Sequence, residues 1–498
     1  MLDILSSIAL DAVLLAILGM AIGIFFGALP GFSGGTAVAL CLPIAVTFSP
    51  INAMVFLINI YGGSHYGGGI TSILLGVPGD AGGAPTVFDG FPMTRQGKVA
   101  EALGYGAMGS ATGGTLSIVA FLLFSPFLAR FALRFAAPEF FVLVLFGLTV
   151  LASVEPGRLW KGLFAGGIGM AVASMGVDQY WNEKRMTFDI PQLYEGLPFI
   201  ASLLGLFCIS QMMVLINEKS LVRGEIEVNP TLRETLAGMG KTFRHIRVLL
   251  QSTVVGTFIG ALPGAGAAVS AFVSYTLARN TSRHPEKYGT GIPEGIIASE
   301  AANSSNVGGA LIPTFALGIP GSVAAAILMG VMMYMGLRPG PRLFIEQMPL
   351  IRTLGVYLLF GCVLIGVFGA LVATYFYRIT RIPLNILIPC TIAAASLGAY
   401  VSRTEFFDVG VMLGMGVLGY VLQKFDYPLA GVVLGMVLGP IAEEYFIQSG
   451  EMFDWDYTVF FTRPICLVLW IGIAASLFGS RILAKRDKMR NADNGTPP

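Results

Sequence analysis

The segment GALPGFSGGTAVALCLPIAVTFSPINAMVFLINIYGGSHYGGGITSILLGVPGD, residues 27–80, decides the fold class of this chain. No Asp, Glu, Lys or Arg occurs among the 68 residues between Asp11 and Asp80, although glycine and proline repeatedly interrupt the apolar run. A loop in water would carry charge, and Gly- and Pro-rich backbone at membrane depth is stable only where protein buries it or where it lines a cavity. The segment therefore predicts broken or re-entrant membrane helices, with breaks in the clusters Gly27–Gly35 and Tyr61–Gly69.

The composition of the whole chain indicates the same class. Of its 498 residues, 55% are hydrophobic and 12% are charged, whereas an average soluble protein has about 25% charged residues. A soluble fold of this size could not cover its surface with so few charges. The apolar segments suffice for about 12 crossings at roughly 20 residues each. We therefore expect an all-α polytopic membrane protein with about 12 transmembrane helices plus broken or re-entrant helices.

Charge and motif content exclude several functional classes. The 30 basic and 29 acidic residues leave a net charge of +1, so there is no electrostatic footprint for nucleic acid. The cysteines and histidines lack metal-ligand spacing, and we expect no transition metal and no cofactor. Thr235–Thr242 nearly matches a phosphate-binding loop, but Thr235 replaces its first glycine, which favours an amphipathic cytoplasmic loop and no ATPase subunit. No nucleophile–base pair is visible, so the chain is predicted not to be an enzyme.

An internal repeat organises the chain. GALPG occurs at Gly27–Gly31 and again at Gly260–Gly264, an offset of 233 residues. GVPG at Gly76–Gly79 is matched by GIPG at Gly318–Gly321, an offset of 242 residues. An insertion near the charged stretch Arg279–Glu294 accounts for the difference between the offsets. The repeat predicts four parts, which are a first transmembrane half at 1–216, a basic cytoplasmic linker at 217–247, a second transmembrane half at 248–483 and a basic, disordered cytoplasmic tail at 484–498.

The placement of basic residues predicts that the two halves are inverted. The first 20 residues contain no Lys or Arg, whereas the linker 217–247 and the tail are rich in both. By the positive-inside rule the linker and the C-terminus are cytoplasmic and the N-terminus is periplasmic. Inverted repeats with Gly/Pro-interrupted segments at matching positions are typical of secondary transporters, whose site lies between the repeats.

The breaks themselves are the first candidates for binding. Proline lacks an N–H group and clashes with the preceding helical turn, so each Pro-Gly step would free backbone groups. Freed N–H groups and helix N-termini attract an anion, and freed carbonyls can coordinate sodium. The alternative is that the breaks are kinks that serve packing alone. The candidate residues in the breaks are Pro30, Gly31, Gly79, Pro263, Gly264, Pro320 and Gly321.

Polar side chains in the same clusters extend the candidate site. Hydroxyl and amide groups can donate to a carboxylate, and their oxygens suit sodium; hydrogen bonding between helices is the alternative role. These candidates are Ser33, Asn59, Ser64, Asn303, Ser304 and Asn306. No Lys or Arg lies in 27–79 or 301–337, so helix ends, co-bound cations or a basic residue from elsewhere must balance an anion.

Three titratable residues are candidates for coupling to an ion or a proton. His65 has an ordinary pKa near about 6.5 and could carry a proton, although a buried, satisfied histidine is the alternative. Asp80 and Glu300 flank the charge-free stretches; carboxylates inside a membrane are functional by default, but both could instead lie at the interface. The coupling ion is thus predicted to be sodium or a proton.

The chain resembles a known family in these motifs. GALPGFSGGTAVALCLPIA, YGGSHYGGGITSILLGVPGDAGGAPTVFDGFPM, GALPGAGAAVSAFVSYTLAR and EAANSSNVGGALIPTFALGIPGS, with the late LGPIAEEYF, are similar to the large membrane subunit of the tripartite tricarboxylate transporter family. The resemblance implies ion-gradient-driven import of a small carboxylate, such as citrate or a related di- or monocarboxylate, across a bacterial inner membrane. It also implies two partners, a small membrane subunit and a periplasmic substrate-binding protein.

A channel is the alternative function. Gated channels for ions or small solutes also use re-entrant Gly-rich segments. Dependence of uptake on a binding protein and on an ion gradient would distinguish the transporter from the channel.

Overall fold

The computed structural model describes residues 9–29, 32–153, 159–178, 180–216, 231–375, 384–475 and 477. Within this part of the chain the structure is almost entirely helical, and the only strands are β1 (Gly176–Val177) and β2 (Lys184–Arg185), which pair antiparallel. The chain divides into two compact units, residues 1–129 with 199–420 and residues 130–198 with 421–498. This division cuts across the halves 1–216 and 248–483, which are defined by sequence repetition and stay a prediction.

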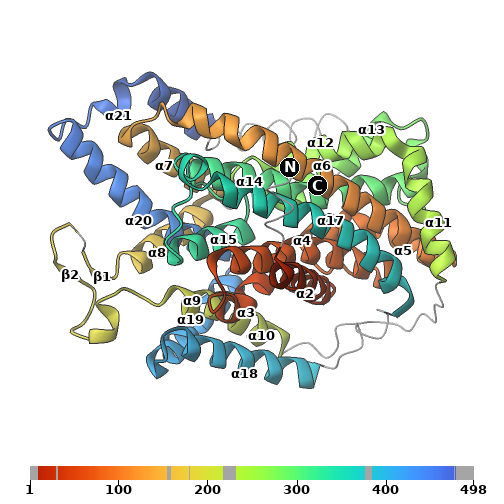
Figure 1. The fold of residues 1–498 in the computed structure, drawn as a ribbon, viewed down its shortest axis with the longest axis horizontal. Coiled ribbons are helices and arrows are strands. Elements are labelled where there is room, and N and C mark those ends of the chain that lie inside the picture. The colour runs from red at the N-terminus through yellow and green to blue at the C-terminus, as the bar shows by residue number, and fades with distance from the viewer. Residues whose placement is uncertain are drawn as a thin grey trace, which may run out of the picture. The chain divides into compact units, whose positions relative to one another are not determined.

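The first unit contains the helices on either side of the GALPG and G-[VI]-P-G motifs of both repeats (Figure 1). Two of its helices, α6 (Val99–Ala132) and α19 (Phe406–Lys424), extend a few residues beyond its boundaries. Its helices are α2 (Leu10–Gly27), α3 (Gly34–Ala45), α4 (Pro50–Leu75), η1 (Ala81–Thr86), α5 (Val87–Arg95), α6 (Val99–Ala132), α9 (Phe199–Leu203), η3 (Leu204–Ile209), α10 (Ser210–Leu215), α11 (Leu232–Thr242), η4 (Phe243–His245), α12 (Ile246–Gly260), α13 (Gly266–Thr281), η5 (Pro285–Lys287), α14 (Pro293–Leu317), α15 (Val323–Tyr334), α16 (Leu343–Glu346), α17 (Met348–Tyr375), α18 (Leu384–Arg403) and α19 (Phe406–Lys424).

The second unit is built on α20 (Leu429–Met452), which packs against α7 (Ala137–Ser153) and α8 (Leu159–Ala173). Its other elements are the strands β1 and β2, η2 (Pro191–Leu193), α21 (Val459–Thr462) and an apolar helix at Pro464–Ala475. Ion pairs tie its segments together: Arg463 pairs with the buried Glu139 at the start of α7, and Arg185 of β2 bonds to Glu443 of α20 at 2.5 Å.

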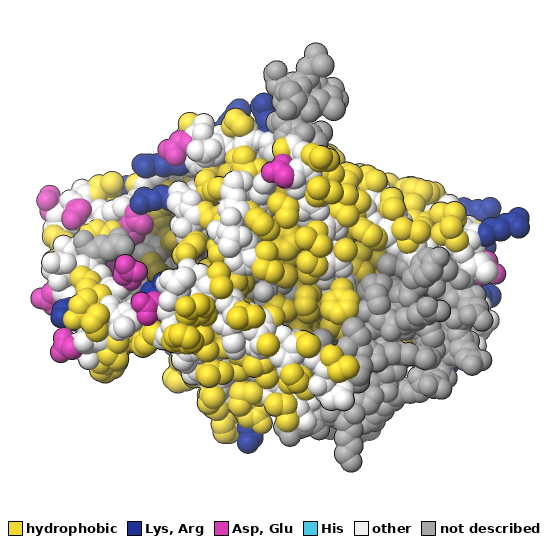
Figure 2. All heavy atoms as spheres, turned by 60° about the horizontal axis from the view of Figure 1, so that its bottom comes forward, with side chains coloured by type: hydrophobic (Ala, Val, Ile, Leu, Met, Phe, Trp, Pro, Cys, Tyr) yellow, Lys and Arg dark blue, Asp and Glu magenta, His cyan; other side chains and the backbone are white. Residues whose placement is uncertain are grey.

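Length and apolar composition confirm the fold class. Five described helices are long and apolar enough to cross a membrane, namely α2, α6, residues 348–371 of α17, α19 and α20. Many large apolar side chains on these helices are exposed, as expected where lipid replaces water. Figure 2 shows one face on which hydrophobic side chains predominate. The protein is therefore an all-α polytopic membrane protein; the number of about 12 crossings stays a prediction.

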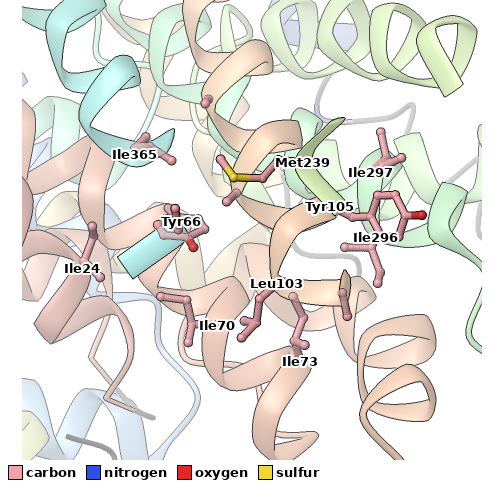
Figure 3. Close-up of a cluster of buried hydrophobic side chains, with 14 of the residues drawn as sticks. Ile24, Tyr66, Ile70, Ile73, Leu103, Tyr105, Met239, Ile296, Ile297 and Ile365 are labelled. Atoms are coloured by element: carbon pink, nitrogen blue, oxygen red, sulfur yellow. The ribbon is translucent and has the colours of Figure 1, made fainter. Parts of the chain in front are cut away.

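A tightly packed core holds the first unit together. Buried side chains from α2, α4, α6, α11, α14 and α17 pack on one another, including Ile24, Ile70, Leu103, Met239 and Ile365 (Figure 3). Because α4 and α14 each contribute to this cluster, the polar residues on the same two helices are held in fixed positions.

The glycine-rich cluster Tyr61–Gly69 lies inside the unbroken helix α4, so the prediction of a break there was wrong. The glycines serve close packing rather than a turn: a side chain at Gly67 would overlap the carbonyl oxygen of Ile24 in α2, and one at Gly69 would overlap the carboxylate of Glu300. Interhelical contacts through small residues are common in membrane proteins because they let backbones approach closely.

The segment between the repeats is also more ordered than predicted. Thr235–Thr242, expected to be a loop, belongs to the amphipathic helix α11, whose Lys241 pairs with Glu101 of α6 at 2.7 Å. Residues 217–230 of the predicted linker and the predicted tail 484–498 lie outside the described residues.

Candidate functional site

Both G-[VI]-P-G sequences end a long helix in the same way. Helix α4 stops at Gly76, with φ of +67°, and α14 stops at Gly318, with φ of +72°; this left-handed conformation is one that glycine adopts without strain. The chain then starts a new helix capped by a side chain. The carboxylate of Asp80 accepts from the Gly83 N–H, and at the matching position Ser322 accepts from the Ala325 N–H.

Close helix contacts recur at the offsets found in the sequence. A side chain at Gly27 would overlap the carbonyl oxygen of Ser64, and one at Gly260 would lie 2.6 Å from the carbonyl oxygen of Asn306. Gly79 similarly packs on the carbonyl of Gly27, and Gly321 on that of Gly260. The sequence repeat is therefore also a repeat of contacts, between α2 and α4 in one half and between α12 and α14 in the other.

Helix N-termini from different repeats lie together in two pairs. Gly35 at the start of α3 packs against Val323 at the start of α15, and Gly82 of η1 packs against Ala267 at the start of α13. Each pair joins a helix that follows a GALPG sequence to one that follows the G-[VI]-P-G sequence of the other repeat. A helix N-terminus carries about half a positive charge, so the α3–α15 pair favours a bound anion. The N-terminus of η1 is already capped by the Asp80 carboxylate.

A hydrogen-bonded cluster joins α4 to α14 beside these N-termini. His65 Nδ1 lies 2.9 Å from the Asn303 Oδ1 and 3.1 Å from the Asp80 Oδ2, and the Asn303 amide donates to the His65 carbonyl oxygen at 3.1 Å. Both neighbours of Nδ1 are acceptors, so this nitrogen carries the proton in the neutral ring. His65 Nε2 is buried without a partner. The structure thus brings together three of the predicted residues.

Two residues of this region were not among the candidates. The Tyr61 hydroxyl lies 2.7 Å from the Ser322 hydroxyl and forms a second link between the repeats. Ser322 could have been found from the repeat alignment, because it follows GIPG as Asp80 follows GVPG. No signal in the sequence distinguishes Tyr61 from the other aromatic residues.

Glu300 lies in a separate buried cradle on α14. The Thr86 hydroxyl donates to its Oε1 at 2.6 Å and the Ser110 hydroxyl to its Oε2 at 3.1 Å, and Gly69 of α4 covers the carboxylate. The side chain is fully buried. No motif or spacing in the sequence distinguishes Thr86 or Ser110 from other hydroxyl residues.

Asn59 and Ser304 face a different space. They line a cavity of about 20 Å³, room for about one water molecule, together with residues of α2, α6 and α17 such as Met20, Ile118 and Gly361. Asn59 Oδ1 and Ser304 Oγ are buried and have no hydrogen-bond partner. These two candidates are therefore close to one another but apart from the His65 cluster.

Unused hydrogen-bonding capacity is concentrated on α4 and α14. Buried polar groups in proteins are nearly always hydrogen-bonded, so a group of exceptions points to a ligand or to water. In the described part of the chain, the unpartnered buried atoms on these two helices are Asn59 Oδ1, His65 Nε2, Tyr66 Oη, Ser304 Oγ, Asn306 Oδ1 and Asn306 Nδ2.

The remaining candidates lie in the breaks. Ser33 caps α3 by accepting from the Thr36 N–H at 3.1 Å. Pro263 lies between α12 and α13 and Pro320 between α14 and α15, and the Gly264 N–H donates to the Gly321 carbonyl at 3.1 Å, so these two breaks contact one another. Pro30 and Gly31 lie outside the described residues.

Comparison with known proteins identifies the family. Residues 13–434 match the model of the "Tripartite tricarboxylate transporter TctA family". The matched residues include both breaks of each repeat. The chain belongs to the TctA family. It is thus a multi-pass membrane protein of a transporter family, and membership implies assembly with other subunits of a tripartite transporter.

Two relatives of this TctA-family chain come from Agrobacterium vitis. An uncharacterised 52.8 kDa protein in the TAR-I ttuC′ 3′ region is 32% identical over 475 residues, which cover 95% of this chain and 94% of the relative. An uncharacterised protein in the TAR-II ttuC′ 3′ region is 31% identical over 237 residues, which cover 47% of this chain and 98% of the relative. No solved structure matches this chain.

Proposed function

We propose that this TctA-family chain is the large membrane subunit that imports a small carboxylate across the bacterial inner membrane. Import is driven by an ion gradient and depends on a periplasmic substrate-binding protein and a small membrane subunit. The observation that supports this function best is the pairing of helix N-termini from opposite repeats beside α4 and α14, two helices with unpartnered buried polar atoms.

The chemistry of this region suits an anion without a basic side chain. Residues 27–79 and 301–337 contain no Lys or Arg, so the attraction for a carboxylate comes from helix N-termini and from neutral donors such as the Tyr61 and Ser322 hydroxyls. The substrate site is expected at the α3–α15 pair, where Ser64 lies against Gly34 and Tyr61 bonds to Ser322. A neutral lining of this kind binds an anion reversibly, as transport requires.

Uptake into proteoliposomes tests the proposal. The chain, reconstituted with its small membrane subunit, is offered labelled tricarboxylates, dicarboxylates and monocarboxylates with the purified binding protein, under a sodium or a proton gradient. Accumulation against the substrate gradient that requires the binding protein and one ion gradient supports the transporter. Equilibration that needs neither supports the alternative, a gated channel, and overturns the proposal.

A further inference from the structure

Glu300 differs from the other buried carboxylates of the described residues in what compensates its charge. Glu139 and Asp408 pair with Arg463 and Arg403. Asp89 on α5 accepts three backbone N–H groups, from residues 289, 291 and 292, at 2.9–3.0 Å. Glu300 has neither: within the described chain no Lys, Arg or His forms an ion pair with it, and its hydrogen bonds come from two hydroxyl groups.

The hydroxyl cradle suits a carboxyl group that changes its protonation state. A backbone N–H can only donate, so the three N–H groups on Asp89 Oδ1 favour the ionised form, and only its Oδ2 accepts from a hydroxyl group, that of Tyr275. A hydroxyl both donates and accepts, so Thr86 and Ser110 can donate to a carboxylate and can accept from a carboxylic acid by rotating one bond. An ionised carboxylate buried without a counter-charge is costly, whereas the neutral acid fits the same cradle without that cost.

The surroundings of Glu300 connect it to the hydrogen-bonded cluster of His65, Asp80 and Asn303. Glu300 packs against Gly69 of α4, and Asp80 packs against the neighbouring Gly68, so the two carboxyl groups flank the same helical turn. The titratable groups that face Glu300 are Asp80, from the segment between α4 and η1, and the Tyr66 hydroxyl of α4. Helix α6 presents Ser110 and glycines, and η1 presents Thr86. Asp80 in turn contacts His65 and reaches Asn303 through it.

We infer that Glu300 carries the coupling proton of this transporter, an inference that rests on the proposed function and specifies its coupling ion. A proton from the outer aqueous phase binds the Glu300 carboxylate to give the neutral acid. The protonated side chain then carries this proton across the membrane together with the substrate. The same proton then leaves to the cytoplasm and restores the carboxylate, so no bond of the substrate changes and no redox step is involved.

Comparison of accumulation with exchange tests this role. Glu300→Gln resembles the protonated acid in shape and charge but cannot release a proton. In proteoliposomes holding the whole transporter, this variant is expected to lose accumulation driven by a proton gradient and to retain exchange of labelled for unlabelled carboxylate. Asp89→Asn, a second buried carboxylate neutralised in the same way, is the matched control, in which accumulation and exchange are expected to change together. Glu300→Gln vesicles that still accumulate substrate under a proton gradient would overturn the inference.

Two measurements decide the inference without relying on that variant's activity. A pH-sensitive dye inside wild-type vesicles should report protons entering with the substrate; uptake driven by sodium with no proton entry overturns the inference and leaves the proposed function standing. Infrared spectra of purified wild-type protein should contain a carboxylic-acid C=O band that is absent from Glu300→Gln. If wild-type vesicles take up no carboxylate, the proposed function fails, while the infrared band still shows whether Glu300 holds a proton; absence of this band at every pH overturns the inference.

Discussion

At the scale of single residues, neutral groups rather than charges dominate the candidate site. Asn303 makes two contacts with His65, one to the ring and one to the backbone, and thereby fixes the distance between α4 and α14. Its amide oxygen also occupies the space beside Gly82, where a side chain would overlap it. One neutral side chain thus links three elements, α4, α14 and η1.

Asn303→Ala should abolish carboxylate uptake while leaving the protein in the membrane. The change removes one of the two acceptors at His65 Nδ1 and the additional side-chain donor to the His65 carbonyl, which keeps its bond within α4, so each lost hydrogen bond should cost about 0.5–1.5 kcal/mol of stability. Uptake and the amount of protein in the membrane should be measured together. The matched control is Asn52→Ala, because Asn52 is a partly exposed amide near the start of α4, far from His65, and bonds to Asp11. Normal uptake by Asn303→Ala would remove this residue from the site.

At the scale of elements, pairs of helices in contact through glycine form the framework of each half. Helix α2 lies on α4 through three glycines, Gly19, Gly23 and Gly27, and α12 lies on α14 through Gly256 and Gly260. In each pair the longer helix carries the polar candidates and the shorter one ends at a GALPG sequence. The packing of the pair therefore sets where the break lies relative to the polar side chains.

Gly27→Ala and Gly260→Ala should each lower thermal stability and uptake. The new methyl group would meet backbone oxygens of Ser64 or Asn306, and a backbone atom cannot move aside as a flexible side chain can; overpacking of this kind costs about 1–3 kcal/mol. Gly414→Ala in α19 is the control, because a side chain there meets nothing within 4 Å and alanine favours a helix over glycine by about 1 kcal/mol. Thermal unfolding of the purified variants should give lower melting temperatures for Gly27→Ala and Gly260→Ala than for Gly414→Ala. Equal melting temperatures would contradict the prediction.

The ion pair between Arg463 and Glu139 should stabilise the second unit. Arg463→Ala leaves the buried Glu139 without its cation; because the Arg463 side chain is 33% exposed, the loss should be smaller than the loss of about 3–5 kcal/mol for a fully buried pair. The double variant Arg463→Met with Glu139→Gln should recover most of this loss because no unpaired charge remains. Glu286→Gln, which breaks an exposed pair with His284, should cost less than about 1 kcal/mol. Denaturant unfolding measures all three; no difference between the buried and the exposed pair would contradict the prediction.

At the scale of the whole molecule, the inverted arrangement of the halves remains a prediction with a direct test. If the halves are inverted, the turn between α3 and α4 faces the periplasm and the segment between α13 and α14 faces the cytoplasm. Ser49 and Arg283 are exposed residues in these two segments. Of the five cysteines, Cys390 is exposed and the other four are buried, so a Cys390→Ser background suits labelling.

Cysteines placed at these two positions should be labelled from opposite sides. In intact cells whose outer membrane has been removed, a membrane-impermeant maleimide is expected to react with Ser49→Cys. Arg283→Cys should react only after the membrane has been permeabilised, because the basic linker that leads into the second half is cytoplasmic by the positive-inside rule. Labelling of both positions from the same side would show that the halves have the same orientation.

Much of the architecture could be predicted from local sequence features. The 68-residue stretch without charge and the low overall charge determine a polytopic helical membrane protein, since only lipid or protein can surround such segments. The G-[VI]-P-G sequences determine where α4 and α14 end, because a left-handed glycine stops a helix wherever it occurs. The offsets of 233 and 242 between the motifs also matched contacts within each half, since each motif lies at the end of a helix whose partner is nearby in sequence.

Contacts between distant segments were decided by the tertiary structure alone. The Tyr61–Ser322 bond and the cradle of Glu300 join residues 190–261 positions apart, and no periodicity or motif carries that information. The glycines of Tyr61–Gly69 were mistaken for a turn because the sequence cannot distinguish a glycine that bends the backbone from one that admits a neighbouring helix. That choice depends on what packs against α4, and its neighbours α2 and α14 are brought there only by the fold.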